Sequence, residues 1–148
     1  MRIRTSVIAA ATVMVTVLSG CDNFHSSDNG ALDGFWQLTN VDSLHNGISN
    51  DVRETQVFWT VQADLLEIRD LSLQHIDVFF RFEHRGDELR LSNPVADNRQ
   101  ISDSLITDVN TILPYGLSHL TETLKILRLD SKKMTLQSER LRMYFRRY

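Results

Sequence analysis

Short runs in which apolar and polar residues alternate are the feature of this sequence that most constrains its fold. In residues 34–41, Trp36 and Leu38 fall on one parity while Gln37 and Thr39 fall on the other. The same alternation recurs in residues 57–63, 78–84, 88–91, 123–129, 134–137 and 141–146. A period of two residues gives a β-strand one apolar face. The sequence therefore predicts an all-β domain of about seven to nine short antiparallel strands joined by tight turns.

The sequence lacks a helix that could cover the sheet, and this limits how the sheet can protect its edges. No amphipathic helix after residue 33 is long enough to cover one face of a sheet. An open sheet would expose unpaired strand edges, so the sheet must close on itself or pack against a second sheet. We expect a small up-and-down β-barrel without a C-terminal helix, and the alternative is a β-sandwich.

The apolar parity changes once within an otherwise regular stretch. Ala63 is the last apolar residue of one parity, and Leu66 is the first of the other. A shift by one residue predicts a β-bulge near Asp64 and Leu65. The alternative is a strand with a short helical end.

Turn-forming residues indicate where other strands end. Arg85-Gly86-Asp87 predicts a tight turn that joins two strands of a hairpin, and Pro94 is expected to end that hairpin. Residues 95–122 mix β-branched residues with Asp, Asn, Pro and Gly. There we expect a short strand near residues 101–106, followed by a loop or a helical turn.

The first residues of the chain have the pattern of a processing signal. Arg2 and Arg4 precede an uncharged apolar run over residues 7–18, which is shorter than the roughly 20 residues that a membrane-spanning helix needs. The run ends in Leu18-Ser19-Gly20-Cys21, which resembles the bacterial lipobox. That resemblance implies cleavage before Cys21 and attachment of diacylglyceryl and acyl groups such as palmitate to it. The alternative is an ordinary secretory signal.

Loss of residues 1–20 would remove Arg2 and Arg4 and change the net charge from -3 to -5. This acidity argues against nucleic acid as a partner.

Because Cys21 is the one cysteine, the sequence excludes a disulfide framework and a cysteine-based zinc cluster. Residues 22–32 are polar, and we expect a tether that reaches at most about 35–40 Å. We expect the membrane to be a partner through the lipid anchor, with no second spanning segment.

Gly34 and Trp36 open the first strand as G-x-W, which resembles the lipocalin signature. In that family the glycine permits a tight entry, the tryptophan fills the closed end of the barrel, and an arginine of the last strand covers it. The candidates for this arginine are Arg142, Arg146 and Arg147. Thr107-Asp108-Val109 matches a second lipocalin motif only in part. The expected absence of a C-terminal helix is a departure from the family.

Residues 33–148 resemble the lipocalin-like lipoproteins of Bacteroidales more closely. The likeness lies in a lipobox and short tether followed by GFWQLTNVD, VFWTVQADLLEIRD, FRFEHRGDELRLSNP and LRMYFRRY. It implies a signal peptide over residues 1–20, a lipidated cysteine and tether over 21–32, and a barrel over 33–148. It also implies a cell-envelope location, which we expect to be the outer membrane. Asp-Ser-Leu tripeptides at Ser43 and Ser104 resemble the O-glycosylation pattern of that phylum.

Aromatic residues are the best indication of a binding function. Trp59, Phe80 and Phe82 are predicted to point inward with Trp36, where they either fill the core or line a ligand pocket. Residues of the opposite parity would form an apolar patch for a partner protein if they cluster, namely Phe58, Phe79 and Tyr144.

Motifs for catalysis or metal binding do not emerge from the sequence. The five histidines lack the spacing of a metal site, and there is no G-x-S-x-G motif. These histidines are His25, His45, His75, His84 and His119. Asp64 and Glu67 have the spacing of a carboxylate pair, but a solvated bulge explains it equally well. The basic residues near the C-terminus, Arg140, Arg142, Arg146 and Arg147, indicate either binding of anionic lipid or polysaccharide or an edge strand protected by charge. Because the domain is acidic overall, we expect the edge strand.

These observations predict a non-catalytic envelope lipoprotein, with no cofactor or metal, that binds a small apolar ligand or a partner protein. The alternative is a solid-core accessory subunit or inhibitor in an outer-membrane assembly. A cavity of at least about 300 Å³ lined by Trp59, Phe80 and Phe82 would favour the ligand. A filled interior with an outer apolar patch would favour the partner.

Overall fold

The computed structural model describes residues 27–97 and 103–148. Cys21 with its lipobox, His25 and the start of the strand expected near residues 101–106 lie outside these ranges. The described residues form ten strands of one antiparallel sheet. The strands are β1 (Gly34–Ser43), β2 (Ser49–Asp51), β3 (Val57–Gln62), β4 (Leu65–Asp70), β5 (Val78–Arg85), β6 (Glu88–Ala96), β7 (Ser104–Leu105), β8 (Glu122–Leu129), β9 (Lys133–Gln137) and β10 (Leu141–Arg147).

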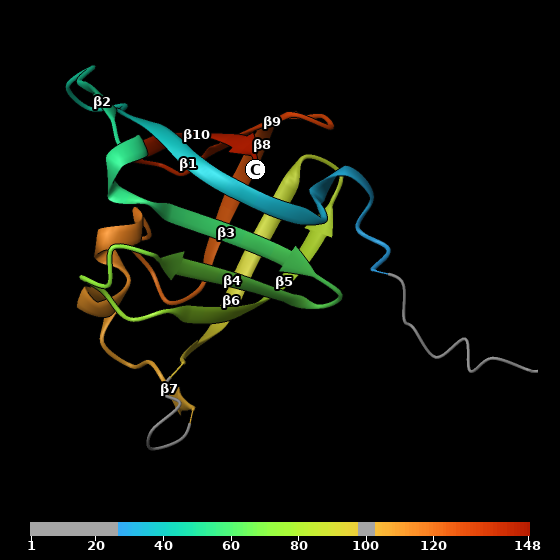
Figure 1. Ribbon diagram of the computed structural model, residues 1–148, viewed down its shortest axis with the longest axis vertical. Helices are drawn as coiled ribbons and strands as arrows, with labels where there is room; N and C mark the ends of the chain where they lie inside the picture. Colours follow the sequence, from blue (N-terminus) through green and yellow to red (C-terminus); the bar gives the residue numbers. More distant parts are fainter. Residues whose placement is uncertain (1–26, 98–102) are drawn as a thin grey trace, which may run out of the picture.

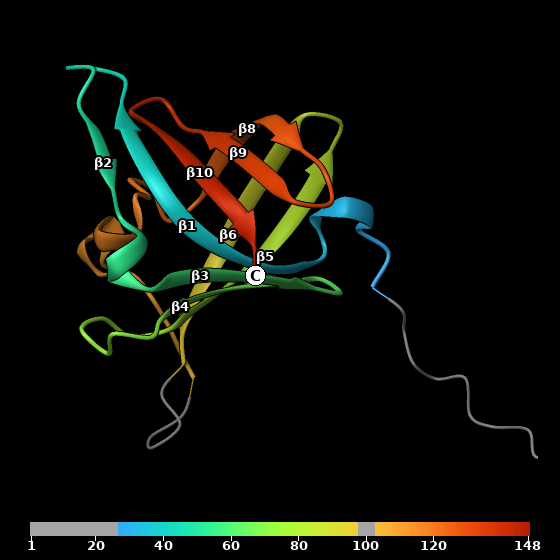
Figure 2. The ribbon, with the colours of Figure 1, turned by 45° about the horizontal axis from the view of Figure 1, so that its top comes forward.

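The sheet closes into an eight-stranded barrel with β2 and β7 as additional short strands. Neighbouring strands follow the order β10-β9-β8-β6-β5-β4-β3-β1, and β10 also pairs with β1. That closing pair runs from Trp36 opposite Arg147 to Ser43 opposite Leu141. Figures 1 and 2 show β1 and β10 side by side from two directions. Closure removes the exposed edges that an open sheet would have, and it confirms the predicted barrel.

The parity change after Ala63 comes from a hairpin, so the prediction of a bulge there was wrong. Gln62 of β3 pairs with Leu65 of β4 across a turn of two residues. Ala63 has a φ of 52°, the left-handed conformation that such turns use. A turn of two residues and a bulge both shift the apolar parity, and the sequence pattern alone did not separate them.

Pro94 does not end its strand, in contrast to the prediction. β6 continues to Ala96, and its pairing with β5 shifts between Ser92 opposite Arg81 and Val95 opposite Phe79. Pro94 lies within this irregularity, after Asn93 with a φ of 50°. A proline is tolerated in a strand where the regular ladder of hydrogen bonds is interrupted.

Four short 3₁₀ helices lie at the two ends of the barrel. η1 (Gly30–Leu32) precedes β1, and η2 (Arg53–Thr55) precedes β3. η3 (Val109–Thr111) and η4 (Leu113–Tyr115) lie together at the end opposite η1 (Figure 1). Among the described residues, no helix is long and apolar enough to cross a membrane.

The domain begins earlier than residue 33. Leu32 is fully buried in the core, and the Asn29 side chain donates to the Asp33 carboxylate and to the Ala63 carbonyl. Residues 27–32, which we expected to belong to the tether, are therefore packed onto the barrel. Their polar composition suggested a linker, because contacts with distant residues such as Ala63 and Arg147 leave no pattern in the local sequence.

Candidate functional site

Trp36 and Arg147 close the end of the barrel at which β1 begins. Trp36 is fully buried, and its Nε1 donates to the Leu32 carbonyl at 2.9 Å. The Arg147 guanidinium carbon lies 4.6 Å from the centre of the Trp36 ring. Arg147 Nη2 donates to the Ala31 and Asp33 carbonyls, both at 2.8 Å. Arg147 is therefore the arginine of the last strand that covers the tryptophan.

Gly34 permits this arrangement. Its φ of 138° is one that side chains other than glycine rarely adopt, and a Cβ atom there would lie 2.9 Å from Arg147 Nη1. Gly34 and Trp36 thus lie at the start of β1, next to Arg147.

The aromatic residues expected to line a pocket pack in the interior of the barrel, and Phe80 also borders a hollow of about 350 Å³. Trp59 and Phe80 are 0% and 1% exposed, and Phe82 packs partly buried against the same core. The ring centroids of Trp59 and Phe145 are 5.0 Å apart. Residues of the last strand therefore occupy space that an interior ligand would need.

A cleft of about 530 Å³ lies at the opposite end of the barrel, where β1 ends and β3 begins. Its walls combine apolar side chains with a nearly equal number of polar ones. The apolar residues are Leu38, Val41, Val52, Val57, Leu113, Pro114, Tyr115 and Leu141, and the polar ones are Asn50, Glu54, Thr55, Asp70, Ser72, Gln74 and His75. The cleft is the candidate functional site.

The segment between β7 and β8 forms one wall of this cleft. Ile112 and Leu117 are fully buried and hold the segment against the barrel. Tyr115 is 1% exposed, and its hydroxyl donates to the Ile76 carbonyl. Burial, together with the negative charges of Asp70 and Asp77, raises the pKa of Tyr115, so its hydroxyl keeps its proton.

Asp70 organises the polar part of the cleft. It is 2% exposed and accepts hydrogen bonds from the Ser72 backbone at 2.8 Å, the Ser72 hydroxyl and the His75 backbone at 3.0 Å. Burial alone would raise the pKa of Asp70, but the hydrogen bonds from Ser72 and His75 lower it below its usual value. An ionised carboxylate can only accept, so His75 Nδ1 donates a hydrogen bond to Asp70 at 2.8 Å, and Nε2 is the ring nitrogen that Asp70 does not contact.

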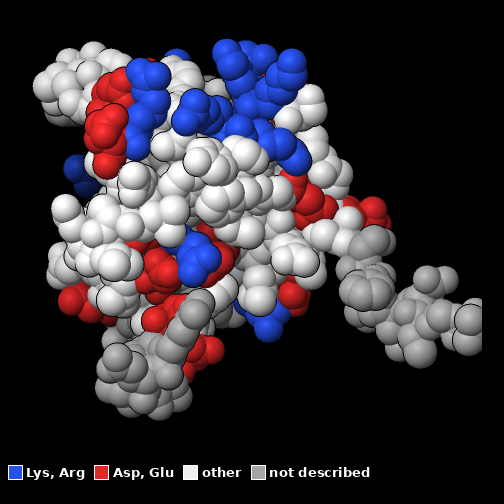
Figure 3. All heavy atoms as spheres, in the orientation of Figure 1, with Lys and Arg blue, Asp and Glu red and all other residues white. Residues whose placement is uncertain are grey.

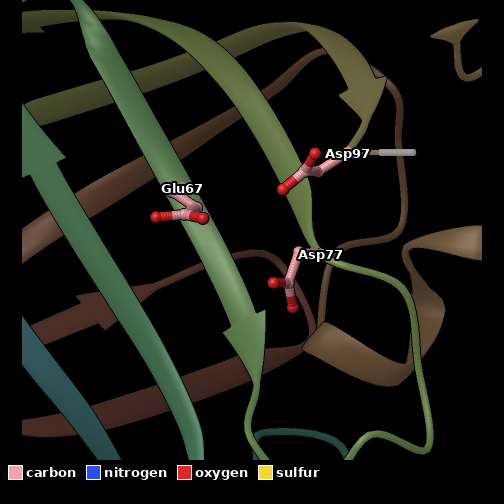
Figure 4. Close-up of side chains that lie close together, drawn as sticks. All are labelled: Glu67, Asp77 and Asp97. Carbon is pink, nitrogen blue, oxygen red and sulfur yellow. The ribbon is translucent and has the colours of Figure 1, made fainter. Parts of the chain in front are cut away.

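A second group of titratable side chains lies on the outside of the barrel, outside the cleft. Oxygen atoms of Glu67, Asp77 and Asp97 lie within 4.8 Å of one another (Figure 4). Arg69 Nε contacts Glu67 at 3.3 Å and Asp77 at 3.2 Å. The arginine already supplies a positive charge to Glu67 and Asp77, so an ion-pair network explains these two carboxylates.

The other histidines and carboxylates that the sequence suggested lie apart. His45 is exposed in the turn after β1, His84 contacts the Gly86 carbonyl at 3.1 Å, and His119 is exposed before β8. Asp64 lies in the β3–β4 turn and pairs with Arg81. Asp64 and Glu67 therefore have different partners.

The outward aromatic residues do not form one patch. Phe58 stacks on Phe35 at 4.7 Å and meets the ring of Tyr148 edge-on at 5.2 Å. Phe79 lines a different cleft, and the Tyr144 hydroxyl donates to Asp42 at 2.7 Å. Equal parity placed these residues on the outer face, but the barrel surface curves through a full turn and separates them.

The remaining motif residues lie at the ends of strands or of a 3₁₀ helix. Ser43 ends β1, and Ser104 is exposed at the start of β7. In Thr107-Asp108-Val109, Asp108 caps η3 by accepting from the Asn110 backbone at 2.9 Å.

Comparisons with known proteins agree with this architecture. A family model described as a lipocalin-like domain matches residues 16–148. No sequence among the curated proteins matches this chain significantly.

Several solved structures share the fold. A lipocalin-like protein from Bacteroides uniformis is 21% identical, with a TM-score of 0.61 over 80% of this chain and 100% of its own. An uncharacterised protein from Bacteroides eggerthii is 20% identical, with a TM-score of 0.55 over 78% of this chain and 98% of its own. A protein from Burkholderia xenovorans is 12% identical, with a TM-score of 0.53 over 78% and 82% of the two chains.

Proposed function

This chain belongs to the family of lipocalin-like domains, and from that premise we propose that it binds a small, mostly apolar ligand without catalysis. A lipocalin-like fold suggests a ligand-binding barrel. The observation that carries the proposal is the cleft of about 530 Å³ at the end of the barrel opposite Trp36. Its volume lies within the range of about 300–1,000 Å³ that small-molecule sites occupy.

The polar groups of the cleft would orient a bound ligand. An apolar body would pack against Leu38, Val57 and Leu141, which line the cleft from three strands. His75 lines the same cleft, and its hydrogen bond to Asp70 directs the remaining lone pair of the ring to Nε2. A ligand hydroxyl or amine would donate to that atom.

A pair of leucine variants tests this site. Leu113 lines the cleft, whereas Leu127 lies on β8, and each is 43% exposed. The neutral fluorescent probe N-phenyl-1-naphthylamine should bind the full chain, and Leu113→Asp should weaken its binding by about tenfold because the apolar wall is lost. Leu127→Asp is the control and should bind as the unmodified chain does. Equal affinities for the two variants would contradict the proposal.

A partner protein is the second candidate function, and the filled interior of the barrel supports it. Leu73 in the β4–β5 loop is 88% exposed and has a φ of 59°, which is unusual for leucine. Ile76 of the same loop is 49% exposed. If this loop docks a partner, Leu73→Ser should abolish a specific cross-link in the cell envelope and leave binding of the probe unchanged.

The third component of the proposal is the location. The pattern of residues 1–21 supports anchoring by lipid at Cys21 and residence at the outer membrane of the cell envelope. The intact mass of the protein from its own cells should show residues 21–148 with diacylglyceryl and acyl groups. A chain with an unmodified Cys21 would contradict this proposal. The same spectrum would report glycans on Ser43 or Ser104 and any retained ligand.

A further inference from the structure

Positive charge is concentrated in the last part of the chain. Residues 122–148 contain eight lysines and arginines against three acidic residues, although the whole chain has a net charge of -3. These residues form β8, β9 and β10, which are adjacent in the barrel. Figure 3 shows Lys and Arg side chains gathered on the upper part of the molecule, where Figure 1 places β9 and β10. The fold therefore turns a stretch of sequence into one basic face.

Three cations of this face border a polar cleft. Arg128, Lys133 and Arg146 line a hollow of about 630 Å³ on the outside of the barrel, together with the hydroxyl-bearing residues Thr135 and Tyr144. The opposite wall carries the carboxylates of Asp42 and Asp51 and the guanidinium of Arg53, which is paired with Asp51. Arg128 Nε is 2.7 Å from the Asp130 carboxylate, whereas Arg146 Nε donates to the neutral side chain of Gln37 at 2.7 Å. Gln37 is 6% exposed, so the Arg146 guanidinium is oriented by a buried amide oxygen.

The pairing of Arg146 with Lys133 has a cost for folding. The two residues are directly opposite each other on β10 and β9, and both are exposed. Like charges in this position destabilise a sheet. An anion in the hollow would contact both side chains, and its attraction to each of them would offset the repulsion between Lys133 and Arg146.

One side of the hollow is next to residues that contact η1, because Arg146 precedes Arg147, whereas the other side is formed by β2 and η2. The Arg147 guanidinium is bonded to the Ala31 carbonyl, and the Arg147 backbone donates to the Lys132 carbonyl at 2.9 Å. Arg147 therefore connects Lys132, the residue before β9, to Ala31 of η1 by hydrogen bonds. From Cys21 to Ser27 the chain runs six residues, a reach of at most about 20 Å. A lipid on Cys21 would hold this part of the barrel near a bilayer.

We propose that the outward cleft formed by Arg128, Lys133 and Arg146 binds phosphate headgroups of anionic phospholipids in the membrane to which Cys21 anchors the chain. The contact would turn the end of β8 at Arg128, the start of β9 and the end of β10 toward the bilayer, and each cation at an anionic surface adds to the attraction. This inference rests on the proposed anchoring but is independent of the apolar cleft at the other end of the barrel.

Lysine labelling tests the proposal because the chain has three lysines, at positions 125, 132 and 133. The acylated chain is placed in nanodiscs of phosphatidylcholine, with or without phosphatidylglycerol, and amines are acetylated briefly and quantified by mass spectrometry. Labelling of Lys133 should fall about fivefold when phosphatidylglycerol is present. Lys125, 3.8 Å from Asp87, is the internal reference and should not change. Salt at about 0.5 M should restore the labelling of Lys133.

Matched variants separate a specific face from a general effect of charge. Arg128→Gln with Arg146→Gln should remove the protection of Lys133. Arg81→Gln with Arg85→Gln makes the same change in net charge on β5, which is four strands from β10 in either direction around the barrel. This control should retain the protection.

Four results would overturn the proposal. The first is equal labelling of Lys133 in both kinds of nanodisc, and the second is a fall in the labelling of Lys125 as large as that of Lys133. The third is an equal loss of protection of Lys133 in the two double variants. The fourth is that inorganic phosphate protects Lys133 equally well in nanodiscs of phosphatidylcholine alone. The last would indicate a site for free anions. An intact mass without lipid would contradict the anchoring alone. The headgroup site would then be tested with the unacylated chain and phosphatidylglycerol vesicles. Protection of Lys133 in that mixture would support the site, and lack of protection would overturn it.

Discussion

Trp36 and Arg147 are partners across the strand pair that closes the barrel, with the guanidinium carbon 4.6 Å from the ring centroid. One residue belongs to the first strand and the other to the last. Their contact therefore stabilises the pairing of β1 with β10, which closes the barrel. Arg147 also bridges to the two carbonyls of Ala31 and Asp33 that flank Leu32. The same side chain holds η1 in place over the closed end.

Arg147→Gln is expected to destabilise the domain by about 1–3 kcal/mol, because it removes a cation–π contact and leaves carbonyls without their donor. Arg140→Gln is the control, since Arg140 is exposed in the β9–β10 turn. Urea denaturation of both variants measures the free energy of unfolding. Equal stabilities would show that Arg147 contributes nothing beyond its charge.

Gly34→Ala is expected to destabilise by about 1–3 kcal/mol, because the new Cβ meets Arg147 at a φ that alanine disfavours. Gly47→Ala is a control with a φ of 70° and open space around the added atom. A double-mutant cycle with Arg147→Gln should show that the effects of Gly34→Ala and Arg147→Gln are not additive. Additive effects would mean that Gly34 is needed for its backbone conformation alone.

The two buried tryptophans should respond differently to replacement by phenylalanine. Trp36 and Trp59 are paired across β1 and β3, and both are fully buried. Trp36 Nε1 donates to Leu32, whereas Trp59 Nε1 has no hydrogen-bond partner among the described residues. Trp36→Phe should therefore cost about 1–3 kcal/mol more than Trp59→Phe in thermal or urea unfolding. The reverse order would indicate that Trp59 Nε1 is bonded to a buried water.

The stabilising effect of Asp70 should depend on pH. Its pKa is lower in the folded protein than the ordinary value of about 3.9, so its contribution is complete above that value and is lost as the pH falls through the lowered pKa. The difference in unfolding free energy between the unmodified chain and Asp70→Asn should be constant from neutral pH down to about pH 5 and shrink below about pH 4. Asp87→Asn, at an exposed carboxylate, is the control. A difference that grows on acidification would contradict the assigned direction.

Local patterns were sufficient for most of the barrel. Alternation located β1, β3, the β5–β6 hairpin and the three C-terminal strands, and the G-x-W motif identified the closing tryptophan. The shift at Ala63 and the irregularity at Pro94 were misread because a turn, a bulge and a strand end have similar local sequences.

The candidate cleft could not be predicted in the same way. Its residues come from strand ends, from the β4–β5 loop and from η4, and their spacing in the sequence has no period. The Asp70-x-Ser72 turn and Pro114-Tyr115-Gly116 were the available signals, and both are ordinary turn sequences. Their meaning depends on Tyr115 reaching the Ile76 carbonyl across the mouth of the barrel.

The sequence by itself determined that the domain consists of antiparallel strands with one apolar face each, because periodicity is a local property. The pairing of β10 with β1 in the tertiary structure decided that the sheet closes into a barrel and does not form a sandwich. Only the tertiary structure decided that Arg147 covers Trp36, that Trp59 and Phe80 fill the interior, and that the open space lies at the mouth. The same holds for the meeting of Arg146 with Lys133 on one outer face. The reason is that enclosed volume and surface charge depend on which distant side chains share a space, and strand register and closure set that sharing.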